Sequence, residues 1–215
     1  WETAGVLKGG KKFWALARTG QSSQLKGRDE VNGYLLLATS CDGTLATMAT
    51  PTTVRVVCNN TLAIAVDGAT QAIRVPHSTE FNASRVKQQL GVSVSQWSEF
   101  MYRMKTLSER KVKPAEALRY FLQVICSTDA DLTDLTQLPQ HRALQKVQDL
   151  YLGQGLGAQL ASAQNTAWGL LNAVTEFVDH EKRARSTDHR LDSAWFGQGA
   201  VLKQKALDHA LQLVA

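Results

Sequence analysis

Four side chains that can carry out acid–base or metal chemistry recur at helical spacing in the segment TAWGLLNAVTEFVDH, residues 166–180. They are Asn172, Glu176, Asp179 and His180. Residues three and four apart share one face of a helix, so the Glu176 carboxylate can meet the His180 imidazole. Such a set can bind a hard divalent cation or act as acid and base, with Asn172 orienting the substrate. One interpretation is therefore a metal-assisted phosphoryl-transfer or hydrolytic enzyme that uses Mg²⁺.

The same helix has a simpler interpretation. Leu170, Val174 and Phe177 gather on its other side, so the polar residues can be the outer face of an amphipathic helix. Contacts between exposed side chains at this spacing are common and weak. One helix also cannot complete the octahedral oxygen shell that Mg²⁺ prefers, so the enzyme needs ligands from a second element. We therefore rank catalysis below a packed helix with a polar face.

A basic segment, EKRARSTDHR, follows directly and is close in sequence to Trp195. Its Arg183, Arg185 and Arg190 can contact phosphates, and an exposed indole can stack on a base. The alternative is a solvated basic end of a helix, where the helix dipole favours cations.

A second basic segment, LKGGKKFWALAR, surrounds Trp14 near the amino terminus. Basic residues interleaved with aromatic residues on a strand are suited to single-stranded nucleic acid. The cations of this segment are Lys8, Lys11, Lys12 and Arg18.

Polar residues also follow a predicted buried strand in RVVCNNTLAIA, residues 55–65. An Asn or Thr at this point is expected to cap a short helix over residues 62–66. Capping leaves Arg55 unexplained, and we count it among the residues that can contact phosphate. The glycine-rich segment GQGLGAQ, residues 153–159, follows a helix rather than a strand and lacks a following Lys-Ser/Thr, so it is predicted to be a flexible turn and not a phosphate loop.

The elements that position these residues change character near residue 80. Short apolar, β-favouring runs at residues 11–18, 33–40, 52–57 and 72–78 predict an antiparallel sheet, with turn signals at residues 19–33 and a hairpin turn at Asp42-Gly43. Beyond residue 80, apolar residues at spacings of three and four predict helices. The first begins at Asn82 or Ser84, with a kink or a division into two helices at Gly91.

The remaining helices are predicted around Pro114 and over residues 140–152, 165–185 and 199–213, and residues 127–140 form an acidic connection. The predicted fold class is therefore α+β, an amino-terminal antiparallel β-sheet followed by a mostly helical second half. Residues 1–80 form the sheet subdomain, and residues 81–215 form a helical subdomain packed on it.

The composition is that of a globular protein with a net charge of +5, which permits nucleic-acid binding without requiring it. No apolar run is long enough to span a membrane, and no signal segment is evident, so the cytoplasm is expected. Cys41, Cys58 and Cys126 are far apart and lack metal-ligand spacing, which argues against structural zinc and a disulfide framework. The first residue is Trp1, and we expect further residues before it.

Three long strings resemble the phage- and plasmid-like family of uncharacterised proteins, a prokaryotic domain of unknown function. They are GYLLLATSCDGTLATMATPTTVRVVCNNTLAIA, TAWGLLNAVTEFVDH and RLDSAWFGQG. The resemblance runs from Gly5 to about Leu207 and implies a mobile element without implying a reaction. The family positions matched here are Arg55, Cys58, Asn60, Thr61, Trp168, Asn172, Glu176, His180, Arg190, Trp195, Phe196 and Gly197.

A weaker resemblance in outline, a small sheet followed by a long helix, is to the single-strand annealing proteins. We therefore expect single-stranded DNA binding, and annealing, in phage or plasmid DNA metabolism. This function implies a homo-oligomer and no cofactor, metal or membrane. Magnesium enters only with the enzyme alternative, and a protein-interaction module of a mobile element is a further alternative. The residues expected to contact DNA are Lys8, Lys11, Lys12, Trp14, Arg18, Arg55, Arg183, Arg185, Arg190 and Trp195.

Overall fold

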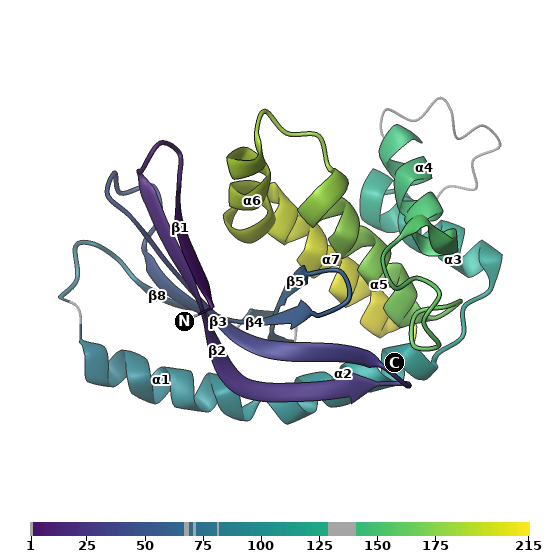
Figure 1. Ribbon diagram of the computed structural model, residues 1–215, viewed down its shortest axis with the longest axis horizontal. Coiled ribbons are helices and arrows are strands. Elements are labelled where there is room, and N and C mark those ends of the chain that lie inside the picture. The colour runs from purple at the N-terminus through teal and green to yellow at the C-terminus, as the bar shows by residue number, and fades with distance from the viewer. Residues whose placement is uncertain (1, 67–68, 71, 81, 129–140) are drawn as a thin grey trace.

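The protein folds as a curled antiparallel sheet followed by a mostly helical second half, which confirms the predicted α+β class (Figure 1). The computed structural model describes residues 2–66, 69–70, 72–80, 82–128 and 141–215. The main sheet has the order β1 (Thr3–Leu7), β2 (Lys12–Leu25), β3 (Asp29–Ser40), β4 (Thr47–Arg55) and β5 (Asn60–Ala63), and β8 (Ile73–Val75) also pairs with β4. A separate small hairpin joins β6 (Ala65–Val66) and β7 (Ala69–Thr70).

The first long hairpin of the sheet extends further than predicted. The turn expected over residues 19–33 is confined to residues 26–28, because β2 continues past Gly20 to Leu25. The pairing of β2 with β3 shifts register between Arg18 and Ser22, and Gly20 adopts a φ of +81° there. Residues 19–21 of β2 therefore lie opposite Gly33 of β3, and extra residues in one strand are accommodated as a bulge, which bends the strand and increases its twist. Gly20 therefore bends the hairpin and does not end it.

The second turn of the sheet lies where it was predicted. Residues 41–46 connect β3 to β4, and Gly43 has a φ of +74°. The Asp42 carboxylate accepts hydrogen bonds from the backbone N–H and the hydroxyl of Thr44. The predicted capped helix over residues 62–66 is wrong. Residues 60–63 instead form β5, which pairs with residues 52–55 of β4 because Asn59, at a φ of +54°, turns the chain back along that strand.

The described residues of the second half form helices and three short π-helical turns. The helices are α1 (Ala83–Ser95), α2 (Trp97–Glu109), α3 (Pro114–Phe121), α4 (His141–Asp149), α5 (Ala167–Glu176), α6 (Thr187–Phe196) and α7 (Gln198–Gln212). The π-helical turns are η1 (Leu122–Cys126), η3 (Leu150–Gln154) and η4 (Phe177–Glu181). Within the described part of the chain, no helix combines the length and apolar character that crossing a membrane requires.

Two helix boundaries differ from the predicted ones. The first predicted helix is divided, but at Gln96 and not at Gly91. The helix predicted over residues 165–185 ends at Glu181, and a separate helix, α6, begins at Thr187, where the Ser186 side chain accepts a hydrogen bond from the His189 N–H. The start of α3 at Pro114 is as predicted. Most of the predicted acidic connection, residues 129–140, lies outside the described residues.

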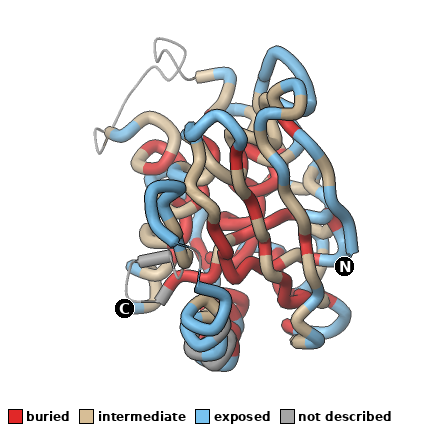
Figure 2. Tube along the Cα trace, turned by 90° about the vertical axis from the view of Figure 1, so that its left-hand side faces the viewer, coloured by how far each residue is buried: buried red, intermediate tan, exposed pale blue. Residues whose placement is uncertain are grey.

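The sheet is covered by helices on both faces. Helices α1 and α2 run along its lower side in Figure 1, and α5, α6 and α7 lie above it. Buried segments concentrate where the sheet meets these helices, whereas α1 is mostly exposed (Figure 2). The largest fully buried side chains include Phe100, Phe121, Met104 and Leu207, which come from α2, α3 and α7. A smaller apolar cluster joins Leu16, Tyr34 and Leu36 of the sheet to Trp195 of α6.

Candidate functional site

A cavity of about 320 Å³, which we call the aromatic pocket, lies between the sheet and α6. Three aromatic side chains line it: Trp14 of β2, Tyr34 of β3 and Trp195 of α6. The rings of Trp14 and Trp195 meet edge to face, with centroids 4.7 Å apart and an interplanar angle of 80°. Both tryptophans are half-buried, so each has a surface that a ligand can reach. The polar lining includes Asn59, Asp179 and His180.

A buried hydrogen-bond network centred on Thr61 fixes one wall of this pocket. The Thr61 hydroxyl accepts from the Trp195 indole N–H at 3.1 Å and from the Lys203 ammonium at 2.8 Å. Because neither of those groups can accept, the hydroxyl proton points to Asp179 Oδ2, 3.0 Å away. Asp179 also accepts from the Thr61 N–H and forms an ion pair with Lys203 at 2.8 Å. The network therefore holds Trp195 in one orientation.

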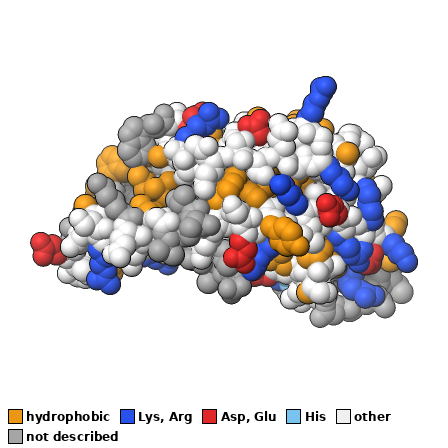
Figure 3. Space-filling view, turned by 90° about the horizontal axis from the view of Figure 1, so that it is seen from below, with side chains coloured by type: hydrophobic (Ala, Val, Ile, Leu, Met, Phe, Trp, Pro, Cys, Tyr) orange, Lys and Arg blue, Asp and Glu red, His pale blue; other side chains and the backbone are white. Residues whose placement is uncertain are grey.

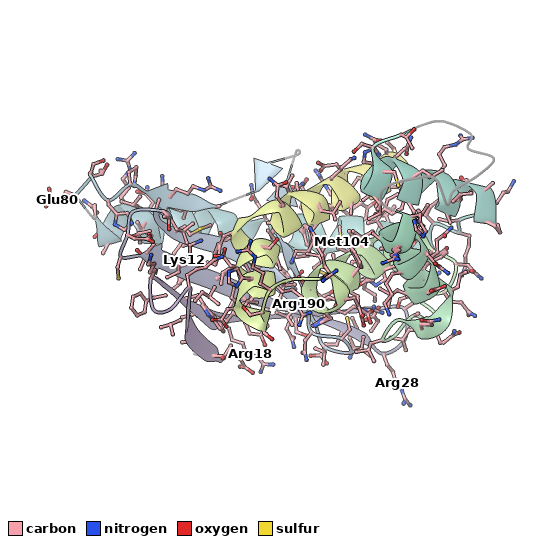
Figure 4. All side chains as sticks on the ribbon, turned by 90° about the horizontal axis from the view of Figure 1, so that it is seen from above. Lys12, Arg18, Arg28, Glu80, Met104 and Arg190 are labelled. Carbon is pink, nitrogen blue, oxygen red and sulfur yellow. The ribbon has the colours of Figure 1, made fainter. Side chains whose placement is uncertain are left out.

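Arg18 lies at the mouth of the aromatic pocket. Its guanidinium donates to the Tyr34 hydroxyl at 3.2 Å and lies 3.6 Å from the Glu2 carboxylate, and both partners line the pocket. Arg190 precedes Leu191, another lining residue, and Arg183 and Arg185 are exposed on the loop between η4 and α6. Lys12 and Arg18 of β2 lie on the same side of the molecule as Arg190 of α6, whereas Arg28 lies far away at the tip of the β2–β3 hairpin (Figure 4).

The amino-terminal lysines have different surroundings. Lys12 forms a 2.6 Å ion pair with Asp192 and lies over the Phe196 ring, and Lys8 reaches the same carboxylate at 3.4 Å. These contacts fasten the β1–β2 turn and the start of β2 to α6. Lys11 is exposed.

Arg55 points into the protein and not towards the aromatic pocket. It is 2% exposed and forms a bidentate ion pair with Asp29, with Nε–Oδ1 and Nη2–Oδ2 distances of 2.7 and 2.9 Å. Asp29 is fully buried and also accepts from the Ser162 hydroxyl and the Trp168 indole N–H. We call these four residues the Asp29 clasp. It joins the sheet to α5 and to the segment before it.

The predicted glycine-rich turn covers this clasp. The Gly157 carbonyl accepts from Arg55 Nη2 at 3.1 Å, and the Leu156 N–H donates to Glu176 Oε1 at 3.0 Å. A Cβ atom at Gly155 would lie 2.7 Å from the Leu150 carbonyl oxygen and 3.0 Å from Glu176 Oε2. The segment is a turn, as predicted, but its glycines allow the backbone to approach Arg55 and Glu176 closely.

The four residues of the predicted catalytic set have separate partners. Glu176 is buried beside the glycine-rich turn, and this burial raises the pKa of its carboxyl group. The Asn172 amide donates to the Trp168 carbonyl within the same helix. Asp179 faces Thr61 and Lys203, and His180 is exposed at the aromatic pocket. The structure thus brings Asp179 and His180 to one cavity and turns Glu176 and Asn172 towards another.

Within the described part of the chain, no group of three or more His, Cys, Asp and Glu side chains has an arrangement that can hold a metal ion.

Sequence reasoning missed Asp29, Ser162 and Lys203. Asp29 is the first residue of β3, directly after a turn, and Ser162 lies in a turn, so nothing in the sequence pattern marks either residue as buried. Lys203 did carry a signal: it is three and four residues before Ala206 and Leu207, on the buried stripe of α7.

A second basic surface lies on the face that carries α1 and α2, where Lys and Arg side chains gather at one end (Figure 3). Exposed basic residues of α2, α3 and their connection include Lys105, Lys111, Lys113 and Arg119. None of these residues lines the aromatic pocket.

Comparison with curated proteins found no match, and neither did comparison with solved structures. A family model does match residues 1–195. That range contains every residue that lines the aromatic pocket and all four residues of the Asp29 clasp, whereas Lys203 lies beyond it. The chain belongs to the family described as Domain of unknown function (DUF932).

Proposed function

We propose that the protein binds single-stranded DNA across the aromatic pocket. The observation that carries this proposal is the combination of three aromatic side chains around one cavity with Arg18 bonded to one of them, Tyr34. A base inserted there contacts Trp14, Tyr34 or Trp195, and its flanking phosphates reach Arg18, Arg183, Arg185 and Arg190. Stacking accepts any base, because every base has a π face.

The charges near the pocket divide into two groups with different roles. Lys8 and Lys12 are paired with Asp192, whereas Arg183 and Arg185 are exposed and can release counterions from DNA. We leave Arg55 out of the DNA-contacting set, because its guanidinium is buried and paired with Asp29. Lys11 remains in the set as an exposed cation beside the β1–β2 turn.

The proposed biological role is annealing of complementary strands in phage or plasmid DNA metabolism. The support is the resemblance in sequence and outline described above, together with a pocket whose aromatic lining suits stacking on any base. Annealing brings two strands together on several copies of the protein, so we propose a homo-oligomer as the active form.

The test is fluorescence anisotropy of a labelled single-stranded oligonucleotide over a salt series. We expect log affinity to fall linearly with log salt, with a slope of about −0.7 for each phosphate contact. Replacing Arg183, Arg185 and Arg190 by Ala is expected to make the slope shallower by about 2. The control variant replaces Lys105, Lys113 and Arg119 by Ala, because it removes the same charge from exposed residues that do not line the aromatic pocket.

Stacking is tested separately with Trp14→Leu, which keeps apolar bulk but removes the indole. Since stacking contributes about 1–3 kcal/mol per base, affinity is expected to fall about 5- to 150-fold with little change in salt slope. Absence of binding at low salt would refute the proposal. Equal loss of binding in both triple variants would instead show that net charge, and not this pocket, attracts the DNA.

A hydrolytic enzyme is the second candidate, because Asp179 and His180 line the same cavity. A carboxylate and an imidazole at one pocket can act as acid and base. The same titrations with and without Mg²⁺, followed by gel analysis of the oligonucleotide, distinguish the candidates. Binding without cleavage supports the DNA-binding protein, whereas cleavage that His180→Gln abolishes supports the enzyme.

A further inference from the structure

A second cavity system, which we call the α7 groove, lies on the other side of Trp195. Its outer part, about 780 Å³, is bounded by the β3–β4 turn, by Arg74 of β8 and by residues of α6 and α7. An inner chamber of about 100 Å³ continues from it towards β4 and β5. The two parts share Met48, Arg74, Trp195 and Gln204, so they form one continuous recess with a wide mouth and a narrow end.

A buried hydroxyl at the narrow end has no partner within the described structure. Thr50 is 6% exposed and lines the inner chamber, and its Oγ1 makes no hydrogen bond with any described residue. The polar side chains near Thr50 do have hydrogen-bond partners. The Thr52 hydroxyl donates to the Thr50 carbonyl, and the Lys203 ammonium makes three hydrogen bonds to Thr61 and Asp179. A buried hydroxyl without a partner destabilises a fold. Thr50 is therefore available to a molecule that enters the chamber.

The mouth of the groove favours an anion. Arg74 is exposed there, and His209 of α7 lines the same opening. Lys205 also lines it, but its ammonium donates to the Gln123 carbonyl and the Ser127 hydroxyl, so Arg74 is the main cation for a ligand. The acid at this opening, Asp208, accepts a hydrogen bond from the Gln204 amide at 2.8 Å. An arginine at the entrance of a partly enclosed groove suits a phosphate, to which it can donate two parallel hydrogen bonds.

The walls of the groove favour a ligand with a planar ring. Trp195 and Phe196 contribute aromatic surface, and Met48 contributes a flexible apolar side chain. A ligand that satisfies all three regions has a phosphate, a flat ring and a polar atom at the far end.

We propose that the α7 groove binds a nucleoside monophosphate, with its phosphate on Arg74, its base along Trp195 and a polar atom on the Thr50 hydroxyl. The groove adjoins the aromatic pocket at Trp195, which lines both, but Thr50 and Arg74 line only the groove. Binding of the monophosphate therefore does not require the protein to bind DNA.

Isothermal titration calorimetry with adenosine monophosphate, adenosine and inorganic phosphate tests the proposal. We expect one monophosphate per chain, bound at least about ten-fold more tightly than either fragment, because phosphate and base contacts act together. Arg74→Gln is expected to weaken the monophosphate about ten-fold. Arg85→Gln removes the same charge from the exposed surface of α1 and is expected to leave affinity unchanged.

Thr50→Val provides the sharper test, because it replaces the hydroxyl by a methyl group of similar size. The free protein is expected to gain about 2–4 °C in Tm, while affinity for the monophosphate falls about five- to ten-fold. Thr53→Val is the matched control. Its hydroxyl donates to the Leu62 carbonyl, so the variant should lose Tm and keep its affinity.

Two results would overturn the proposal. Binding of the monophosphate no tighter than inorganic phosphate would leave only a general anion contact at the mouth. A lower Tm in Thr50→Val with unchanged affinity would mean that the hydroxyl serves the fold, through an ordered water, and not a ligand.

Discussion

Replacing Arg55 with Met is expected to destabilise the protein strongly through the charge that it leaves behind. Asp29 is fully buried, and its carboxylate would keep only Ser162 and Trp168 as side-chain donors. Met is similar in length to the aliphatic part of Arg, so loss of packing is small. The carbonyls of Leu156 and Gly157 also lose their guanidinium partner.

The magnitude follows from the burial of the pair. Removing one partner of a buried ion pair costs about 3–5 kcal/mol, because the remaining charge has lost both water and its counterion. For a chain of this size, each kcal/mol lowers Tm by about 2–4 °C, so the expected fall is about 6–20 °C. Replacing Asp29 with Asn in the same chain removes the uncompensated charge, so the double variant is expected to be more stable than Arg55→Met alone.

The assay is chemical unfolding followed by tryptophan fluorescence, with Arg103→Met as the control. Arg103 pairs with Glu99 one helical turn earlier, and both side chains are partly exposed, so this variant is expected to lose at most about 0.5 kcal/mol. The reasoning is refuted if Arg55→Met costs no more than Arg103→Met. It is also refuted if the effects at positions 29 and 55 simply add.

Two further predictions concern the glycine-rich turn and the carboxylate beneath it. Gly157→Ala is expected to lower the free energy of unfolding by about 1–3 kcal/mol more than Gly43→Ala. Both glycines have a φ near +74°, so the backbone strain is the same. Only at Gly157 would a Cβ atom meet side chains, Val57 at 2.7 Å and Arg55 at 3.0 Å. Equal losses in urea unfolding would contradict this. Glu176→Gln is expected to be more stable than the wild type at pH 7. Burial raises the pKa of the Glu176 carboxyl group in the folded state, so the wild type loses stability as the pH rises above the unfolded-state value near 4.5. The difference in stability between the two proteins is therefore expected to vanish below about pH 4. A difference in Tm between Glu176→Gln and the wild type that stays constant across pH 3–8 would contradict this prediction.

The sequence predicts the order of the fold better than the lengths of its elements. The change from alternating strands to helical spacing near residue 80 is local, so it is visible in the pattern. Gly20 resembles a turn signal, but the long-range pairing of β2 with β3 makes it a bulge. Helix α6 was missed because its burial is weak: of its residues, only Ala194 is buried.

The candidate site was predicted in part. Trp14, Trp195 and Arg18 were chosen from their residue types, and the structure places all three at one pocket. The polar helix face was expected to act as a unit, but a helix that is buried all round sends adjacent side chains to different partners. Glu176 meets the glycine-rich turn, while Asp179 meets Thr61 of β5. Those partners are over a hundred residues away in the chain or lie in a turn, and no spacing rule connects them.

The Asp29 clasp can be completed only late in synthesis of the chain, because its four residues lie far apart in the sequence. Asp29 and Arg55 leave the ribosome long before Ser162 and Trp168, which complete their hydrogen bonds. At about 5–20 residues per second, the roughly 110 residues from Arg55 to Trp168 take on the order of 5–20 s to make. During that interval the Asp29–Arg55 ion pair of the nascent sheet lacks Ser162 and Trp168, and the face of the sheet that α5 covers is exposed. Chaperones and proteases have their best access to the sheet at this stage.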